Sequence, residues 1–442
     1  MTTAGGSITQ LIALGAADKY LTQGPTITYW RFKYNKYTNF ALEAIEQNFQ
    51  TQVMFGSDTQ LTLNRTGDMI YHTYVIVDLP GIMGNGTTSN SIYPDLTGAD
   101  LNDPCDADAV AVPDPAALPW VAWTNAVGQW LVRKASIVIG GQQIDNVYSD
   151  YLFMWEELSG KPGKRLAEMI GKESSFTDLI HNSQYDRRLY IPLPFWFTQV
   201  SGNALPVVAL QFHGIQLYIS FADLPSCVQT SADKPQVLKK ASKQVLTDND
   251  LRAAIETTYV YLDIEERDRL SMGSFEQLIT QVQSYNITSN SPQIRLGLNF
   301  NHPVIELIWG IKRTCQSAVN NHFNYAGTAG EDPIKAVSLK LNNLPRFSPK
   351  EGRYFRLVQP YQTHTNIPST YVYSYSFALH PEDAQPSGSC NFSRIDNIEL
   401  TFEMQDSVGG NVGSGDVQVI VFARNWNVVR YRDGLGGLAF SN

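Results

Sequence analysis

The stretch Tyr373–Phe402, YSYSFALHPEDAQPSGSCNFSRIDNIELTF, decides the fold class of this chain. Its flanks are rich in aromatic, β-branched and aliphatic residues, which predicts one strand over Ser374–Leu379 and another over Ile395–Phe402. The residues between the flanks include two prolines and a glycine, which interrupt regular structure. The stretch therefore predicts two strands joined by a long turn.

The turn itself is expected to serve folding and not catalysis. Gly388 follows Pro386 and Ser387, and we expect it to adopt a positive φ or to allow close approach of another backbone segment. We expect Asn391, Arg394 and Asp396 to satisfy backbone polar groups between the strands.

The same pattern of short apolar or alternating runs, separated by turn residues, continues along the chain and predicts a mostly β protein. The expected strands are Val53–Leu63, Ile70–Leu79, Leu131–Ile139, Leu189–Phe197, Val207–Phe221, Thr258–Ile264, Gln293–Phe300, Val304–Ile311, Ala336–Leu341, Tyr371–Leu379, Asn397–Glu403 and Val417–Phe422. Helical signals are few. They cover a turn with Ile8, Leu11, Ile12 and Ala16, the segment Ser149–Leu158, and Asn249–Glu256 with Asp248 as its cap.

An internal repeat divides the chain. Lys134-Ala135-Ser136 and Lys335-Ala336-Val337 each begin an apolar strand, and IQLYISF (Ile215–Phe221) resembles IELTFEM (Ile398–Met404). Short strands that repeat once in this way predict two tandem antiparallel jelly-roll sandwiches of about eight strands each, with few short helices.

The expected organisation is an N-terminal arm over residues 1–26, a first jelly roll over 27–222, and a linker with the second jelly roll over 223–442. The boundary is placed after Phe221 because the sequence then becomes polar. Two long loops, Pro80–Pro119 and Thr314–Asp332, are expected at related places in the two halves.

Composition limits the function classes. Charged residues make up 17% of the chain, below the ~25% of typical soluble domains, so much of the surface is expected to lie against neighbours. The net charge of −9 argues against direct contact with nucleic acid, which requires clustered Lys and Arg. The one basic cluster, Lys234, Lys239, Lys240 and Lys243, is expected to be a solvated linker.

Cysteine and hydropathy patterns predict a protein without structural disulfides or a membrane span. Cys105, Cys227, Cys315 and Cys390 are far apart and form no CxxC pair, so we expect free thiols in a reducing compartment. The longest apolar run, Leu205–Leu224, is interrupted by polar residues.

Catalytic and ligand-binding motifs are weak, and we expect no catalytic, cofactor-binding or metal site. Gly81–Ser89 has the glycines of a phosphate loop but no lysine. The acidic group Asp103, Asp106, Asp108 and Asp114 differs from an EF-hand loop and is expected to be solvated. His213 and His380 are expected to be packed or hydrogen-bonded strand residues.

The segment SFALHPEDAQPSGSCNFSRIDN resembles the signature of the major capsid proteins of nucleocytoplasmic large DNA viruses. Further similar segments occur in the family's order along the whole chain. They are Gly15–Trp30, Tyr37–Phe49, Ile139–Leu158, Arg187–Phe197, Leu205–Phe221, Thr258–Leu270, Val304–Arg313 and Val428–Asn442. The resemblance is greatest to the algal-virus and giant-virus branch.

This resemblance implies a structural protein and not an enzyme, with a double jelly roll that forms homotrimers of nearly hexagonal outline. It implies neighbouring capsomers, minor capsid proteins and penton proteins as partners, with an inner membrane contacted only indirectly and no direct contact with nucleic acid. The implied location is the outer capsid shell of the virion of a large dsDNA virus, assembled in the host cytoplasm.

Two other classes remain open on the residues alone. A jelly-roll enzyme or lectin needs a converging polar site, which the sequence does not reveal. A monomeric cell-surface adhesion module of paired sandwiches is expected to carry disulfides and a secretory signal.

Overall fold

The computed structural model describes residues 5–30, 34–83, 120–164, 166–230, 239–240, 244–327, 330–405 and 416–440. The chain forms two structural units, Met1–Phe40 and Ala41–Asn442. The first unit contains the helices α1 (Gly5–Ile12) and α2 (Ala16–Thr22), and neither helix buries a residue. The expected amphipathic turn is confirmed for Ile8, Leu11 and Ile12, which form an exposed stripe on α1, whereas Ala16 begins α2.

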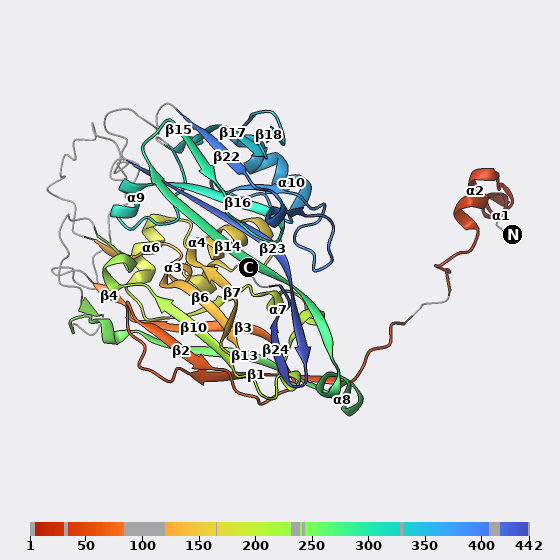
Figure 1. Ribbon diagram of the computed structural model, residues 1–442, viewed down its shortest axis with the longest axis horizontal. Coiled ribbons are helices and arrows are strands. Elements are labelled where there is room, and N and C mark those ends of the chain that lie inside the picture. Colours follow the sequence, from red (N-terminus) through yellow and green to blue (C-terminus); the bar gives the residue numbers. More distant parts are fainter. Residues whose placement is uncertain are drawn as a thin grey trace. The chain divides into compact units, whose positions relative to one another are not determined.

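The second unit begins with a sandwich of two sheets (Figure 1). One sheet has the order β1 (Phe40–Asn48), β13 (Arg252–Leu262), β3 (Met69–Leu79) and β8 (Arg187–Pro192), with β9 (Leu205–Pro206) beside β3. The other has the order β2 (Asp58–Thr62), β10 (Ile215–Phe221), β6 (Val132–Ile139) and β7 (Gln142–Tyr148). Alternation explains the packing, since Ile215, Leu217 and Ile219 of β10 are buried while Tyr218 faces outward.

A second sandwich follows in the chain. One of its sheets has the order β14 (Phe275–Ser289), β23 (Val417–Arg432), β16 (Pro303–Arg313) and β20 (Tyr373–Ser376), with β21 (Cys390–Asn391) and β24 (Leu435–Leu438) at its margins. The other has the order β15 (Gln293–Gly297), β22 (Ile398–Met404), β17 (Ile334–Leu341) and β18 (Leu344–Pro345), with β19 (Lys350–Glu351) beside β17.

The two sandwiches share one strand order. When the strands on the main path of each sandwich are numbered along the chain, the order is 1-8-3-6 in one sheet and 2-7-4-5 in the other, in both halves. This is a jelly-roll arrangement, so the expected fold class is confirmed. The sequence repeat is also confirmed, because β6 and β17 occupy the same place, as do β10 and β22.

The transition between the sandwiches lies later in the chain than the expected boundary at residues 222 and 223. Strand β13 pairs with β3 in the first sandwich, from Arg252 to Val260. The connection to the second sandwich is α8 (Ile264–Met272), whose first N–H is accepted by the Asp263 side chain. The segment between β10 and β13 contains β11 (Val228–Thr230), β12 (Lys239–Lys240) and two 3₁₀ turns, Leu224–Cys227 and Asp248–Asp250.

The expected helix over Asn249–Glu256 is wrong. The Asp250 carboxylate accepts the backbone N–H of Thr247, as in a capping box, but this cap serves only the short Asp248–Asp250 turn. The following residues enter β13, because Ile255 and Tyr259 are drawn into the core of the first sandwich. Tertiary burial has overridden a local capping signal.

Two expected strands are partly helical. The run Leu189–Phe197 ends in α7 (Trp196–Gln199), and the run Val207–Phe221 begins with a 3₁₀ turn over Val207–Ala209. The remaining elements outside the main sheets are β4 (Ile82–Met83), β5 (Val121–Trp123), α3 (Val127–Leu131), α4 (Ser149–Ser159), α5 (Ala167–Ile170), α6 (Phe176–Ser183), α9 (Thr314–Ala318), a π-helix (Tyr354–Val358) continuing into α10 (Gln359–Thr363), and 3₁₀ turns at Ser201–Asn203 and Phe392–Arg394. The expected helix Ser149–Leu158 is confirmed as α4.

The apolar core shows how the sandwiches are joined. A large cluster fills the first sandwich and also includes Ile308, Ile420 and Phe422 from the second, whereas another cluster lies within the second sandwich. Figure 1 shows α3 and α4 between the two sets of strands. Among the described residues, no helix is long and apolar enough to cross a membrane.

Candidate functional site

Most of the sequence elements with weak ligand-binding signals lie outside the part of the chain that the structure describes. The acidic group Asp103–Asp114 and most of the Gly81–Ser89 and Pro80–Pro119 segments lie outside the described residues, as do Lys234 and Lys243 of the basic cluster. Within the described ranges, no group of three or more His, Cys, Asp or Glu side chains is arranged to hold a metal. Lys240 forms an ion pair with Asp250.

The two signature histidines are hydrogen-bonded, as expected, but neither lies in a strand. His213 Nδ1 lies 2.9 Å from the carbonyl oxygen of Gly436, so this ring holds the C-terminal hairpin of β23 and β24 against the first sandwich. The backbone N–H of His380 donates to the Ser387 hydroxyl at 2.9 Å within the signature turn.

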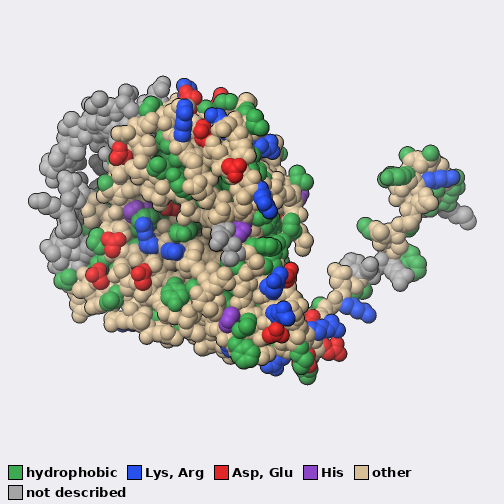
Figure 2. Space-filling view, viewed as in Figure 1, with side chains coloured by type: hydrophobic (Ala, Val, Ile, Leu, Met, Phe, Trp, Pro, Cys, Tyr) green, Lys and Arg blue, Asp and Glu red, His purple; other side chains and the backbone are tan. Residues whose placement is uncertain are grey.

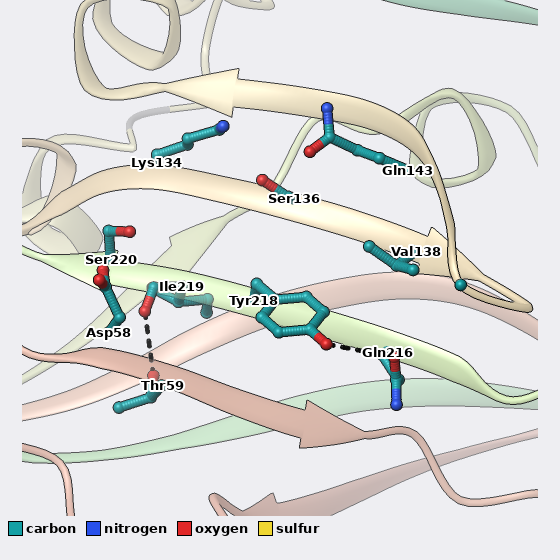
Figure 3. A pocket seen from close by; sticks show the side chains of 11 residues that line it. Asp58, Thr59, Lys134, Ser136, Val138, Gln143, Gln216, Tyr218, Ile219 and Ser220 are labelled. Atoms are coloured by element: carbon teal, nitrogen blue, oxygen red, sulfur yellow. Dashed lines mark hydrogen bonds between the residues drawn. The ribbon is translucent and has the colours of Figure 1, made fainter.

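A hollow of about 500 Å³ lies on the outer face of the sheet β2–β10–β6–β7 (Figure 3). Figure 3 shows the Tyr218 ring over β10, with Asp58 and Lys134 on the strands to either side. The Tyr218 hydroxyl donates to Gln216 Oε1 at 3.3 Å, and the rest of the lining mixes hydroxyl, amide and charged groups with Val138 and Ile219. Small-molecule sites are mostly apolar, so this polar, open hollow has the character of a hydrated surface.

The contact between the sandwiches contains buried charged and aromatic side chains. Lys312 of β16 is buried to 4% exposure and forms an ion pair with Asp150 of α4. Its Nζ lies 5.3 Å, 5.6 Å and 5.4 Å from the ring centroids of Trp130, Phe323 and Tyr325. Burial lowers the pKa of Lys312, although Asp150 opposes this effect.

A second buried group lies farther along β16, around Glu306. Arg424 Nη1 donates to Glu306 Oε1 at 2.9 Å, and His364 Nε2 lies 2.8 Å from Glu306 Oε2. The Arg424 guanidinium also lies 4.3 Å from the ring centroid of Trp155 in α4. Burial alone raises the pKa of Glu306, but the charges and hydrogen bonds of His364 and Arg424 outweigh it and lower the pKa.

The edges of the two sandwiches meet at β7 and β14. Asp145 Oδ1 accepts the backbone N–H of Val282 at 3.0 Å, and the Gln281 amide donates to the Ile144 carbonyl. The Asp145 carboxylate therefore satisfies a donor on the exposed edge of β14. Burial raises the pKa of Asp145 to about 7, despite its hydrogen bonds.

A loop of the second sandwich completes the contact. The His322 ring stacks on Trp130 with 3.4 Å between the centroids, and its Nε2 lies 2.8 Å from the Ser226 carbonyl oxygen. Burial lowers the pKa of His322 to about 4, so the ring is neutral at pH 7. Asn320 donates to the carbonyls of Pro225 and Val228, both at 2.7 Å. The sandwiches are thus joined by stacked rings and paired buried charges.

Sequence reasoning missed this contact, although a signal was present. Glu306 interrupts the apolar run Val304–Ile311, Lys312 directly follows it, and a charged residue inside a buried strand is rarely left unpaired. Their partners, Arg424 and Asp150, are far away in the sequence and could not be identified from it.

The expected role of the signature turn is confirmed in part. Gly388 has a φ of +142°, and a Cβ at this position would lie 2.8 Å from the carbonyl oxygen of Phe377. The Asn391 side chain accepts the N–H of Ser393 at 3.1 Å. Arg394 and Asp396 are exposed and make no side-chain hydrogen bond to the described backbone, so the expectation for these two residues is wrong in the isolated chain.

The expectation of four free thiols is also wrong in part. Cys227 and Cys390 are free, but Cys315 is disulfide-bonded. Cys105 lies outside the described residues. Wide spacing in the sequence does not prevent pairing, because the fold brings distant segments together.

Comparison with known proteins identifies the family of this chain. A family model described as "Major capsid protein N-terminus" matches residues 28–263, and one described as "Large eukaryotic DNA virus major capsid protein" matches residues 266–437. The chain is 34% identical to the major capsid protein of Pyramimonas orientalis virus, over 99% of this chain and 100% of that protein. It is 30% identical to the major capsid protein of Phaeocystis pouchetii virus, again over 99% of this chain and 100% of that protein.

Solved structures agree. PBCV-1 VP54 has a TM-score of 0.71 and 27% identity, with 94% of this chain and 100% of that chain covered. The Faustovirus major capsid protein has a TM-score of 0.66 at 11% identity, over 96% of each chain, which shows a shared fold. The curated relatives are structural proteins, so the protein is a shell component and not an enzyme. The chain belongs to the major capsid proteins of large eukaryotic DNA viruses.

Proposed function

We propose that this protein forms homotrimeric capsomers of nearly hexagonal outline, which tile an icosahedral shell. The observation that carries the proposal is the identical strand order of the two sandwiches. Three copies of a chain with two similar sandwiches place six similar bodies around one axis, so the outline is nearly sixfold although the symmetry is threefold. Such a block packs against six neighbours on a flat facet.

The joint between the sandwiches supports this role. A capsomer of fixed outline requires that the two sandwiches of each chain keep their relative orientation. The Lys312–Asp150 pair, the Arg424 guanidinium on the Trp155 ring and the stacked Trp130 and His322 rings bury polar groups in specific geometry between the sandwiches, and such groups resist sliding.

We assign the N-terminal arm a task of its own, separate from that of the two jelly rolls. The exposed stripe of α1 offers an apolar face, and we assign it to contact with minor capsid proteins in the finished shell. Penton proteins close the fivefold corners, where a nearly hexagonal block does not fit. The net charge of −9 disfavours direct contact with packaged DNA, and the inner membrane is contacted only indirectly.

Assembly is assigned to the host cytoplasm. The free thiols of Cys227 and Cys390 suit a reducing compartment, although Cys315 is disulfide-bonded.

Size-exclusion chromatography with light scattering tests the trimer directly. The chain has a mass of 49.3 kDa, so the expected species has three times that mass. Negative-stain images of the same fraction should show a nearly hexagonal outline. A folded, monodisperse monomer at high concentration would contradict the proposal.

A further inference from the structure

A short helical segment of the second sandwich has an apolar face that nothing in the described chain covers. The π-helix and α10 together span Tyr354–Thr363. Phe355 is fully buried in the core of its own sandwich. On the other side, Leu357, Val358 and Tyr361 are 38%, 39% and 77% exposed. Their spacing places them on one side of the helix, which forms an apolar face.

The duplication identifies a counterpart for this segment. In each sandwich a helical segment follows the fifth strand of the main path and precedes the sixth. In the first sandwich this segment is α4, and its Tyr151, Met154 and Trp155 are 1%, 0% and 8% exposed. The counterpart of the uncovered face is therefore a covered one.

The covering surface is the outer face of β16 and β23. Tyr151 of α4 packs edge-on against Phe422 with 5.5 Å between the ring centroids, and Trp155 lies under Arg424. Gly310 leaves room for α4, since a Cβ there would lie 2.6 Å from Met154 Cε. Strands β16 and β23 are the third and eighth strands of their sandwich.

The first sandwich has an equivalent surface on its own third, eighth and sixth strands, β3, β13 and β8. Val75, Val77 and Leu189 point into its core, so the alternate residues Tyr74, Ile76 and Tyr190 lie on the outer face of the sheet, where Ile76 is only 2% exposed. Ile76 lies opposite both Tyr190 and Ala254 in the strand register, which places the apolar side chains together. The two tyrosines are partly exposed.

We infer that the face Leu357, Val358 and Tyr361 of one copy docks on the face Tyr74, Ile76 and Tyr190 of the next copy. This contact between copies has the same arrangement as the contact that α4 makes with β16 and β23 within the chain. Each copy then presents one surface and receives one, and such a head-to-tail contact closes after three copies when each chain spans a third of the ring. The inference rests on the proposed trimer and names its contact surfaces.

Substitution on both sides tests the contact in the full-length chain. Tyr361→Asp and Tyr74→Asp place a carboxylate on each face in turn, and Met272→Asp makes the same change at a residue of α8 that is 85% exposed and outside both faces. A buried tyrosine at the centre of an interface commonly changes affinity by roughly thirty-fold or more. We expect both face variants to raise the concentration at which the trimer dissociates by at least that factor, while Met272→Asp leaves it unchanged.

Far-UV circular dichroism and thermal unfolding of each monomer fraction check that the fold is retained. If a carboxylate at residue 74 disturbs the sheet, Tyr74→Ser removes the ring without adding a charge, and the same direction of change is expected. If the wild type is trimeric and both face variants remain trimeric at every concentration, the proposed docking surfaces are wrong and the trimer proposal stands. A wild-type chain that is monomeric overturns both.

Discussion

Replacing Arg424 with methionine tests whether the buried charge pair beneath Trp155 of α4 stabilises the chain. The Arg424 side chain is 1% exposed and pairs with Glu306, which is fully buried. The substitution leaves the Glu306 carboxylate with His364 as its one remaining partner in this group. Removal of one member of a buried pair typically costs about 3–5 kcal/mol, and we expect the lower end because His364 remains.

The same strand offers a matched control. Arg430 of β23 pairs with Glu276 at 2.7 Å, but both side chains are more than half exposed. Solvent screens such a pair, so Arg430→Met is expected to cost less than about 1 kcal/mol. Urea unfolding followed by tryptophan fluorescence measures both values, at one protein concentration because subunit association adds to apparent stability.

A third variant separates loss of a charge pair from loss of packing. Glu306→Gln combined with Arg424→Met removes both charges, and we expect it to be more stable than Arg424→Met alone, because no carboxylate is left buried without its cation. Equal losses for Arg424→Met and Arg430→Met, within about 0.5 kcal/mol, would refute the argument from burial.

Three further outcomes follow from individual features. Gly388→Val should lower soluble yield and melting temperature, because its Cβ would lie 2.8 Å from the Phe377 carbonyl oxygen at a φ of +142°, and unchanged values would refute this. Because burial raises the pKa of Asp145 to about 7, from an ordinary value of 3.8, the folded state retains a proton that the unfolded state loses, and stability falls as pH rises from about 4 to about 7. Asp145→Asn should remove this pH dependence, which amounts to at most about 4 kcal/mol of unfolding free energy. A profile of melting temperature against pH identical to that of the wild type would contradict the expectation. Deletion of Met1–Gly24 should leave the trimer and its melting temperature intact, because α1 and α2 bury no residue, while impairing incorporation into particles, and loss of the trimer would show that the arm belongs to the core.

Strand positions in the interior of the chain were predictable because each depends on a local period. The run Val304–Ile311 became β16, and Ser149–Leu158 became α4. The edge strand β1 and the long strand β14 were not predicted, since edge strands carry mixed polar residues whose pairing partner is distant in the sequence. The helix predicted over Asn249–Glu256 failed for a related reason, because its cap was local and its strand partner was not.

The sequence by itself determined the fold class, the duplication and the family, because these depend on alternation, on turn residues and on segments such as IQLYISF and IELTFEM that can be compared directly. Only the tertiary structure decided how the halves are joined. Lys312 contacts Asp150, Arg424 contacts Trp155, and Asp145 contacts Val282 across separations that no local pattern encodes. Local periodicity states which side of a strand is buried, but the identity of the covering surface depends on how distant elements pack, and that information exists only in the folded chain.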